Sequence, residues 1–60
     1  MQAMKAVEIA HALYRAHGDK AEWEAAQKER QYKSAGKDTE AAHWRAIRGS
    51  IRQMRGAIQG

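Results

Sequence analysis

The chain has 60 residues, of which 43% are hydrophobic, and it carries 11 Lys and Arg against 7 Asp and Glu, for a net charge of +4. A chain this short forms one domain, residues 1–60, with a thin core, and the lack of cysteine excludes disulfides and thiolate metal sites as its stabilisers. No apolar run approaches the roughly 18 residues of a membrane span and no signal-peptide pattern is present, so we expect a cytoplasmic protein stabilised by helix packing or self-association.

The first predicted helix covers residues from about 2 to 17. Its apolar positions recur at helical spacing, and they are Ala3, Ala6, Val7, Ala10, Leu13 and Tyr14. Gly18 follows where a left-handed C-cap is expected. Asp19 is then predicted to be the N-cap of the next helix, with Glu22 completing a capping box.

The second predicted helix covers residues from about 20 to 35 and is the least amphipathic of the three. One stripe, interrupted by Lys28, holds Ala21, Ala25, Tyr32 and Ala35. Trp23, Ala26 and Arg30 point almost the other way. If that stripe faces inward, Trp23 is left partly exposed. It is then either an interface anchor, since aromatic residues are enriched at hot spots, or a side chain folded over the end of a neighbouring helix.

The third predicted helix covers residues from about 39 to 57, after a C-cap at Gly36 and an N-cap at Asp38 or Thr39. It carries two parallel stripes. The apolar stripe is Trp44, Ile47, Ile51, Met54 and Ile58. The arginine stripe is Arg45, Arg48, Arg52 and Arg55. A third face of small residues holds Ala42, Ala46, Gly49, Gln53, Gly56 and Ala57. We expect the apolar stripe to be the main core contribution and the arginine stripe to line its rim.

Connections of only a few residues imply antiparallel neighbours, so the predicted fold is all-α, a three-helix up-down-up bundle. The frame His17-Gly18, Gly36, Trp44 and Ile47 on an Ala-rich background resembles a family of short uncharacterised bacterial all-helical proteins. This resemblance implies the helical fold and no activity.

No pattern of catalysis or nucleotide binding appears in the sequence, and we predict no enzyme activity and no cofactor. Glu8-x-x-His11 and Glu40-x-x-His43 match the spacing found in di-iron bundles. We interpret both as surface Glu–His pairs without metal, because Glu8 and His11 lie opposite the apolar face of their helix. His17 is interpreted as a group that caps carbonyls or meets the helix dipole.

The arginine stripe has three interpretations. Its side chains form a solvated flank or pair with Glu22, Glu24 and Glu29 of the second helix, they bind nucleic acid phosphates, or they meet an acidic protein or membrane surface. We favour the first.

The sequence therefore predicts a non-catalytic helical interaction module that self-associates, because the core is thin, Trp23 is left outside it and the third helix has a face of small residues. The alternative is a basic accessory protein that binds nucleic acid through the arginine stripe. The candidate partner-binding residues are Arg45, Arg48, Arg52, Arg55 and Trp23.

Overall fold

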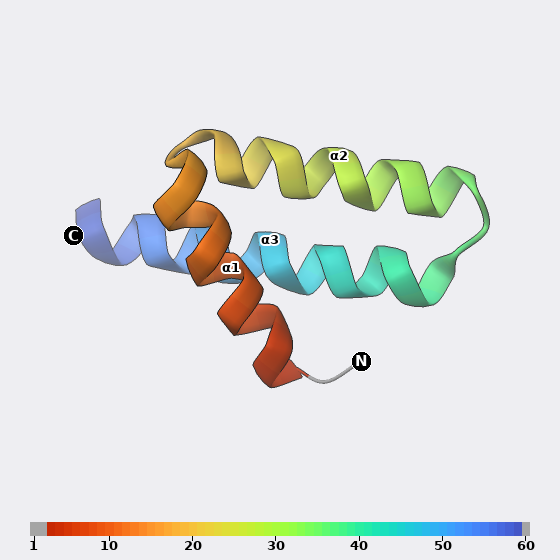
Figure 1. The fold of residues 1–60 in the computed structure, drawn as a ribbon, viewed down its shortest axis with the longest axis horizontal. Helices are drawn as coiled ribbons and strands as arrows, with labels where there is room; N and C mark the ends of the chain where they lie inside the picture. Colours follow the sequence, from red (N-terminus) through yellow and green to blue (C-terminus); the bar gives the residue numbers. More distant parts are fainter. Residues whose placement is uncertain (1–2, 60) are drawn as a thin grey trace.

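A computed structural model describes the backbone of residues 3–59 and the side chains of residues 6–56. Over this range the chain forms three helices and no strand: α1 (Ala3–His17), α2 (Lys20–Ser34) and α3 (Asp38–Gln59) (Figure 1). The all-α, three-helix prediction is confirmed. Each predicted boundary lies within two residues of the observed one.

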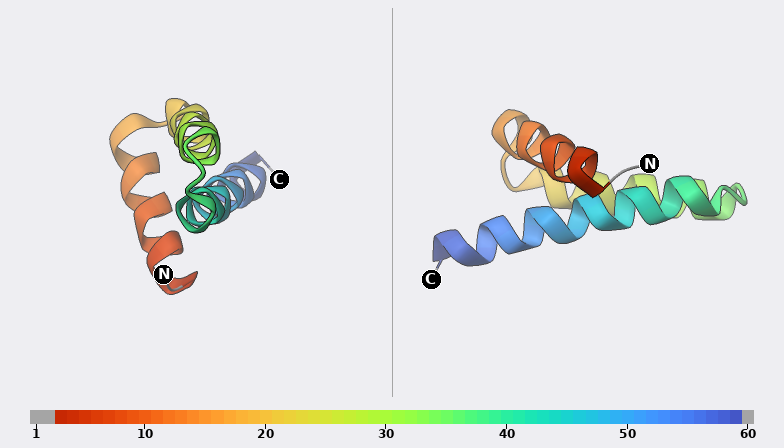
Figure 2. Two further views of the ribbon diagram at one scale, coloured as in Figure 1. Left: turned by 90° about the vertical axis from the view of Figure 1, so that its right-hand side faces the viewer. Right: turned by 90° about the horizontal axis from the view of Figure 1, so that it is seen from below.

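The helices are arranged as a hairpin with a third helix laid across it. α2 and α3 run antiparallel along their length, and α1 crosses them obliquely on one face (Figures 1 and 2). Ala6 and Ala10 are the fully buried residues of α1 within the described side chains. They lie one turn apart, and their small size lets α1 cross close to α3. The helices thus follow the predicted up-down-up order, but the axis of α1 is tilted relative to the axes of α2 and α3.

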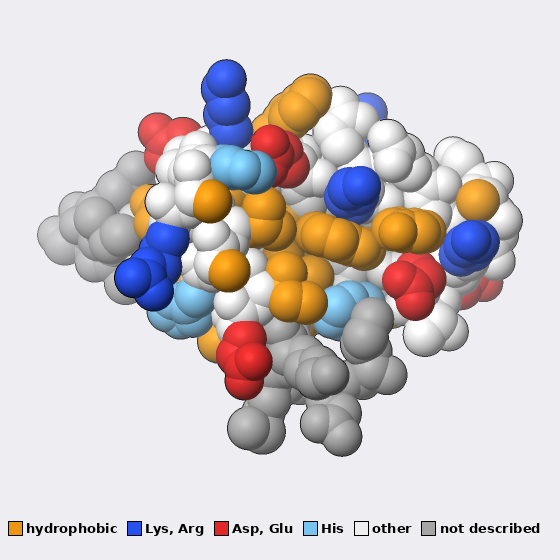
Figure 3. Space-filling view, in the orientation of Figure 1, with side chains coloured by type: hydrophobic (Ala, Val, Ile, Leu, Met, Phe, Trp, Pro, Cys, Tyr) orange, Lys and Arg blue, Asp and Glu red, His pale blue; other side chains and the backbone are white. Residues whose placement is uncertain are grey.

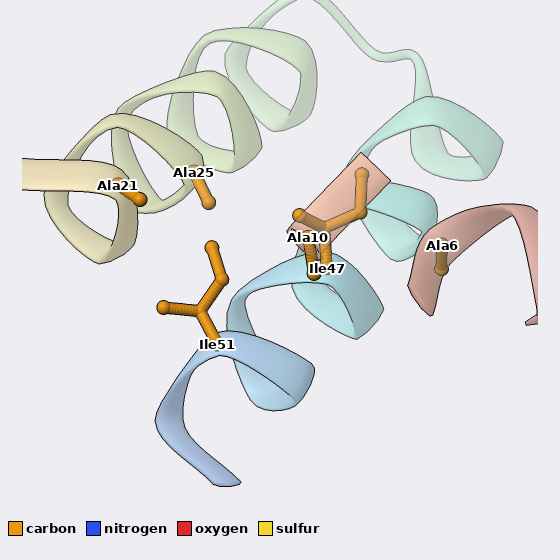
Figure 4. Packing of buried hydrophobic residues seen from close by; sticks show 6 residues of the cluster. All are labelled: Ala6, Ala10, Ala21, Ala25, Ile47 and Ile51. Carbon is orange, nitrogen blue, oxygen red and sulfur yellow. The ribbon is translucent and has the colours of Figure 1, made fainter. Parts of the chain in front are cut away.

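The core consists of two isoleucines packed among alanines. Ile47 and Ile51 of α3 are fully buried, and both project into the space between the helices (Figure 4). Four alanines complete the cluster, namely Ala6, Ala10, Ala21 and Ala25. Because alanine leaves room for a facing side chain, the helices approach closely around the two isoleucines. The apolar stripe of α3 is therefore the main core contribution, as the sequence predicts.

Partly buried side chains surround this centre. They are Ile9, Leu13, Tyr14, Trp44 and Met54. Trp44 and Met54 extend the apolar stripe of α3 beyond the two isoleucines, whereas the side chain of Ile58 lies outside the described residues.

Two glycines end α1 and α2 as predicted. Gly18 has φ +60° and Gly36 has φ +77°, the left-handed region that side chains with a Cβ rarely adopt. After α2, the N–H of Lys37 donates to the carbonyl of Tyr32 (2.9 Å) and the N–H of Gly36 donates to that of Lys33 (3.1 Å). These two bonds form a Schellman motif, which satisfies the last carbonyls of the helix.

Asp19 is the N-cap residue of α2, as predicted, but the predicted capping box is wrong. Asp19 has helical dihedral angles, φ −62° and ψ −24°, and its side chain makes no capping hydrogen bond. The tight turn at Gly18 leads directly into α2, and the carbonyl of Gly18 accepts from the N–H of Ala21 at 3.0 Å. The Glu22 carboxylate instead accepts a hydrogen bond from Arg55 of α3. The Glu22 carboxylate, which the local sequence pattern assigns to the N-cap, therefore binds the guanidinium of Arg55.

Candidate functional site

The arginine stripe lies against the acidic edge of α2. Arg48 forms an ion pair with Glu29 (3.3 Å between Nη1 and Oε1). Glu22 binds two arginines, Arg55 through Nη1 at 2.5 Å and Arg52 through Nε at 3.5 Å. The pairing of the stripe with the second helix is therefore confirmed for Glu22 and Glu29. These pairs join α2 to α3 along the rim of the core.

The four arginines of the stripe differ in how much charge remains available. Arg55 also reaches Asp19 at 3.8 Å, so it meets two carboxylates. The Arg52 side chain is 70% exposed despite its ion pair. Arg45 is exposed and makes no ion pair with any side chain among residues 6–56. Within the stripe, the charges most accessible to a partner are thus those of Arg45 and Arg52.

Glu24, which the sequence also offers as a partner for the arginines, contacts a different group. Its carboxylate meets Nδ1 of His17 at the end of α1. His17 lies in the last turn of α1. The His17–Glu24 contact links the end of α1 to α2 next to the tight turn at Gly18.

Trp23 is the most exposed of the large hydrophobic side chains that the structure describes. It is 62% exposed on α2, and Val7, at 46% on α1, is the other large hydrophobic residue in the exposed class. The prediction that Trp23 lies outside the core is confirmed. It remains outside because Ala21 and Ala25 occupy the inward side of α2.

A groove beside Trp23 is built from all three helices. It has a volume of about 590 Å³ and is lined by Leu13 of α1, Trp44 of α3 and a row of α2 side chains. The α2 residues are Trp23, Glu24, Gln27, Lys28 and Gln31, and His17 closes the end near the tight turn. Figure 3 shows hydrophobic side chains gathered across the middle of this face, between α2 and α3. Sequence periodicity does not reveal this groove, because it depends on how α1 crosses the hairpin.

The two Glu-x-x-His segments have different surroundings. Glu8 and His11 are exposed, as predicted. His43 is 8% exposed, so its interpretation as a surface group is wrong. Its ring meets that of Trp44 edge-on, with 6.4 Å between the centroids, and its Nε2 has no hydrogen-bond partner among the described residues. No group of three potential metal ligands occurs within the described residues.

No family model, curated protein or solved structure matches this chain. The resemblance to short bacterial helical proteins therefore remains a prediction. Across the part of the chain that the structure describes, none of the helices has the length and apolar character needed to cross a bilayer.

Proposed function

We propose that the protein is a non-catalytic helical interaction module that self-associates, with Trp23 as its anchor. The observation that carries this proposal is the 62% exposure of Trp23, in a fold whose largest fully buried side chains, among residues 6–56, are Ile47 and Ile51. Covering a tryptophan exposed to this extent removes roughly 100–150 Å² from water, worth about 2–4 kcal/mol at the usual coefficient. This gain is comparable to a large part of the stability of a small domain.

The charge arrangement supports the same proposal. Arg48, Arg52 and Arg55 meet carboxylates of their own chain. A phosphate partner would have to compete with these contacts, whereas an apolar partner at Trp23 would not. Self-association is favoured over other protein partners because a small scaffold without disulfides gains core area by pairing with a second copy.

The experiment is sedimentation equilibrium on the wild-type protein and two matched variants. Trp23→Gln removes the anchor and keeps a residue with good helix propensity, and we expect it to be monomeric at concentrations where the wild type is a dimer. Val7→Gln removes the other exposed large hydrophobic side chain and should leave the dimer intact. Circular dichroism checks that both variants keep the wild-type helix content. A wild type that stays monomeric refutes self-association. A Trp23→Gln variant that dimerises as strongly as the wild type refutes the role of Trp23.

Nucleic acid binding through the arginine stripe is the second candidate, favoured by the net charge of +4 and by the exposure of Arg45 and Arg52. Phosphate contacts are strongest at low salt, so binding to duplex or single-stranded DNA should be detectable at about 50 mM salt and fall steeply above it. Replacing Arg45 and Arg52 together with Gln should weaken DNA binding, and replacing Lys20 and Lys33 together with Gln is the control for the loss of two charges on another helix. Absence of binding at low salt refutes this candidate.

A further inference from the structure

The face of α2 that is turned away from α1 and α3 has two flanks of different chemistry (Figure 2). One flank holds Trp23 and Arg30, at helical spacing. The other flank holds Glu24 and Lys28, one turn apart, and Gln27 lies between the two flanks. Lys28 and Arg30 are exposed, and neither makes an ion pair with a carboxylate of residues 6–56. The face therefore presents an indole ring, a carboxylate and two cations to a partner.

These side chains complement one another when a second copy of α2 packs antiparallel to the first. The two-fold axis of an antiparallel helix pair sets each flank against the same flank of its mate. With the axis crossing α2 near residue 26, Glu24 of each copy lies beside Lys28 of the other. Trp23 of each copy then lies over the guanidinium of Arg30 of the other, a cation–π arrangement. The midpoint of 24 and 28 is residue 26 and that of 23 and 30 lies between 26 and 27, so both pairs require the same register.

A parallel pair of α2 helices has the opposite electrostatics. Its two-fold axis brings unlike flanks together. Lys28 of each copy then lies beside Arg30 of the other, so cation meets cation at two places, which is unfavourable. The carboxylate of Glu24 gains no cation in return. The charges on this face of α2 therefore favour the antiparallel pair.

We propose that the protein self-associates by packing α2 antiparallel against α2 of a second copy, with a two-fold axis near residue 26. The Glu24–Lys28 and Trp23–Arg30 contacts each form twice across this axis. Glu24, whose charge a neutral His17 does not cancel, gains a cation in the dimer, and Trp23 is covered. This inference rests on the proposed self-association through Trp23, and it adds the orientation, the register and the side chains that select a second copy of this chain.

Charge reversals test the register through the dissociation constant of the dimer, measured by sedimentation equilibrium on the full chain. Lys28→Glu sets a carboxylate against Glu24 at both contacts and should weaken the dimer about fivefold to thirtyfold, as for two exposed charge pairs turned repulsive. A parallel dimer would strengthen, because the new carboxylate would meet Arg30. The double variant Glu24→Lys with Lys28→Glu restores opposite charges and should bind within about threefold of the wild type. Lys33→Glu is the matched control, because Lys33 is exposed on α2 but lies toward α3, beside Asp38 and Arg45.

Single cysteines report the orientation directly, because the chain has none of its own. In Gln27→Cys the two thiols lie side by side near the axis and should form a disulfide-linked dimer under mild oxidation. In Ser34→Cys they lie about 22 Å apart along the helices and should not. A wild type that stays monomeric overturns the proposed self-association and this inference with it. A wild-type dimer that Lys28→Glu leaves unchanged or strengthens, or that cross-links through Ser34→Cys rather than Gln27→Cys, overturns the antiparallel register alone.

Discussion

Replacement of Ile51 by Ala is predicted to remove a large part of the free energy of unfolding of this fold. Ile51 is fully buried and belongs to the same cluster as Ala21 and Ala25 of α2. The change deletes three carbon atoms at about 0.8 kcal/mol each, before any cost of the cavity. Alanine neighbours cannot extend into the space that is left, so the total should lie in the range of about 2–5 kcal/mol. A 60-residue domain typically has only about 3–9 kcal/mol to lose.

Urea unfolding followed by circular dichroism measures this cost, with all samples at one protein concentration because self-association would add to stability. If Ile51→Ala does not fold, Ile51→Val provides the measurement, with an expected loss of about 0.5–1.5 kcal/mol. Val7→Ala is the control, since Val7 is 46% exposed, and it should change stability by less than about 0.5 kcal/mol. A cost below about 1 kcal/mol for Ile51→Ala would refute the view that α3 supplies the core.

Three further predictions are checked by the same unfolding assay. Gly36→Ala should lower the free energy of unfolding by about 1 kcal/mol because φ at this residue is +77°. Gly49→Ala should raise it by about 0.5–1 kcal/mol, since the added Cβ would meet nothing within 4 Å. Equal effects of the two substitutions would contradict the backbone conformations described for these glycines. Ala25→Leu should cost about 1–3 kcal/mol by overpacking the fully buried position against α3, and a stabilised variant would show that the core is looser than described. Glu22→Gln should cost about 0.5–1.5 kcal/mol through its arginine partners on α3, with the loss shrinking in high salt; a salt-independent loss would indicate packing as the cause.

Local patterns predicted the features of this fold that depend on neighbours along the chain. Because their spacing is that of one helical turn, Ile47 and Ile51 share one face of a helix whatever packs against it, and both are fully buried. The glycines at 18 and 36 end their helices for a reason internal to the backbone, since each needs a positive φ. The same logic placed Trp23 outside the core, because Ala21 and Ala25 take the inward side of α2.

Features that depend on the crossing of helices could not be predicted in this way. Glu22 has the spacing of a capping residue, but Arg55, 33 positions further along the chain, takes its carboxylate. Nothing in the segment around Glu24 indicates that it contacts His17 rather than an arginine. The sequence around His43 predicts a surface position, but His43 is buried in the folded chain. The groove beside Trp23 is lined by side chains of all three helices, Leu13 and Trp44 among them, so it depends on how the helices pack.

The mass of the wild-type protein in solution across a dilution series tests the central proposal most directly. Self-association through Trp23 predicts a mass near twice the chain mass of 6.8 kDa at high micromolar concentration, falling toward the chain mass on dilution. The same series on Trp23→Gln should give the chain mass throughout. A wild type that sediments as a folded monomer at every concentration would contradict the proposal.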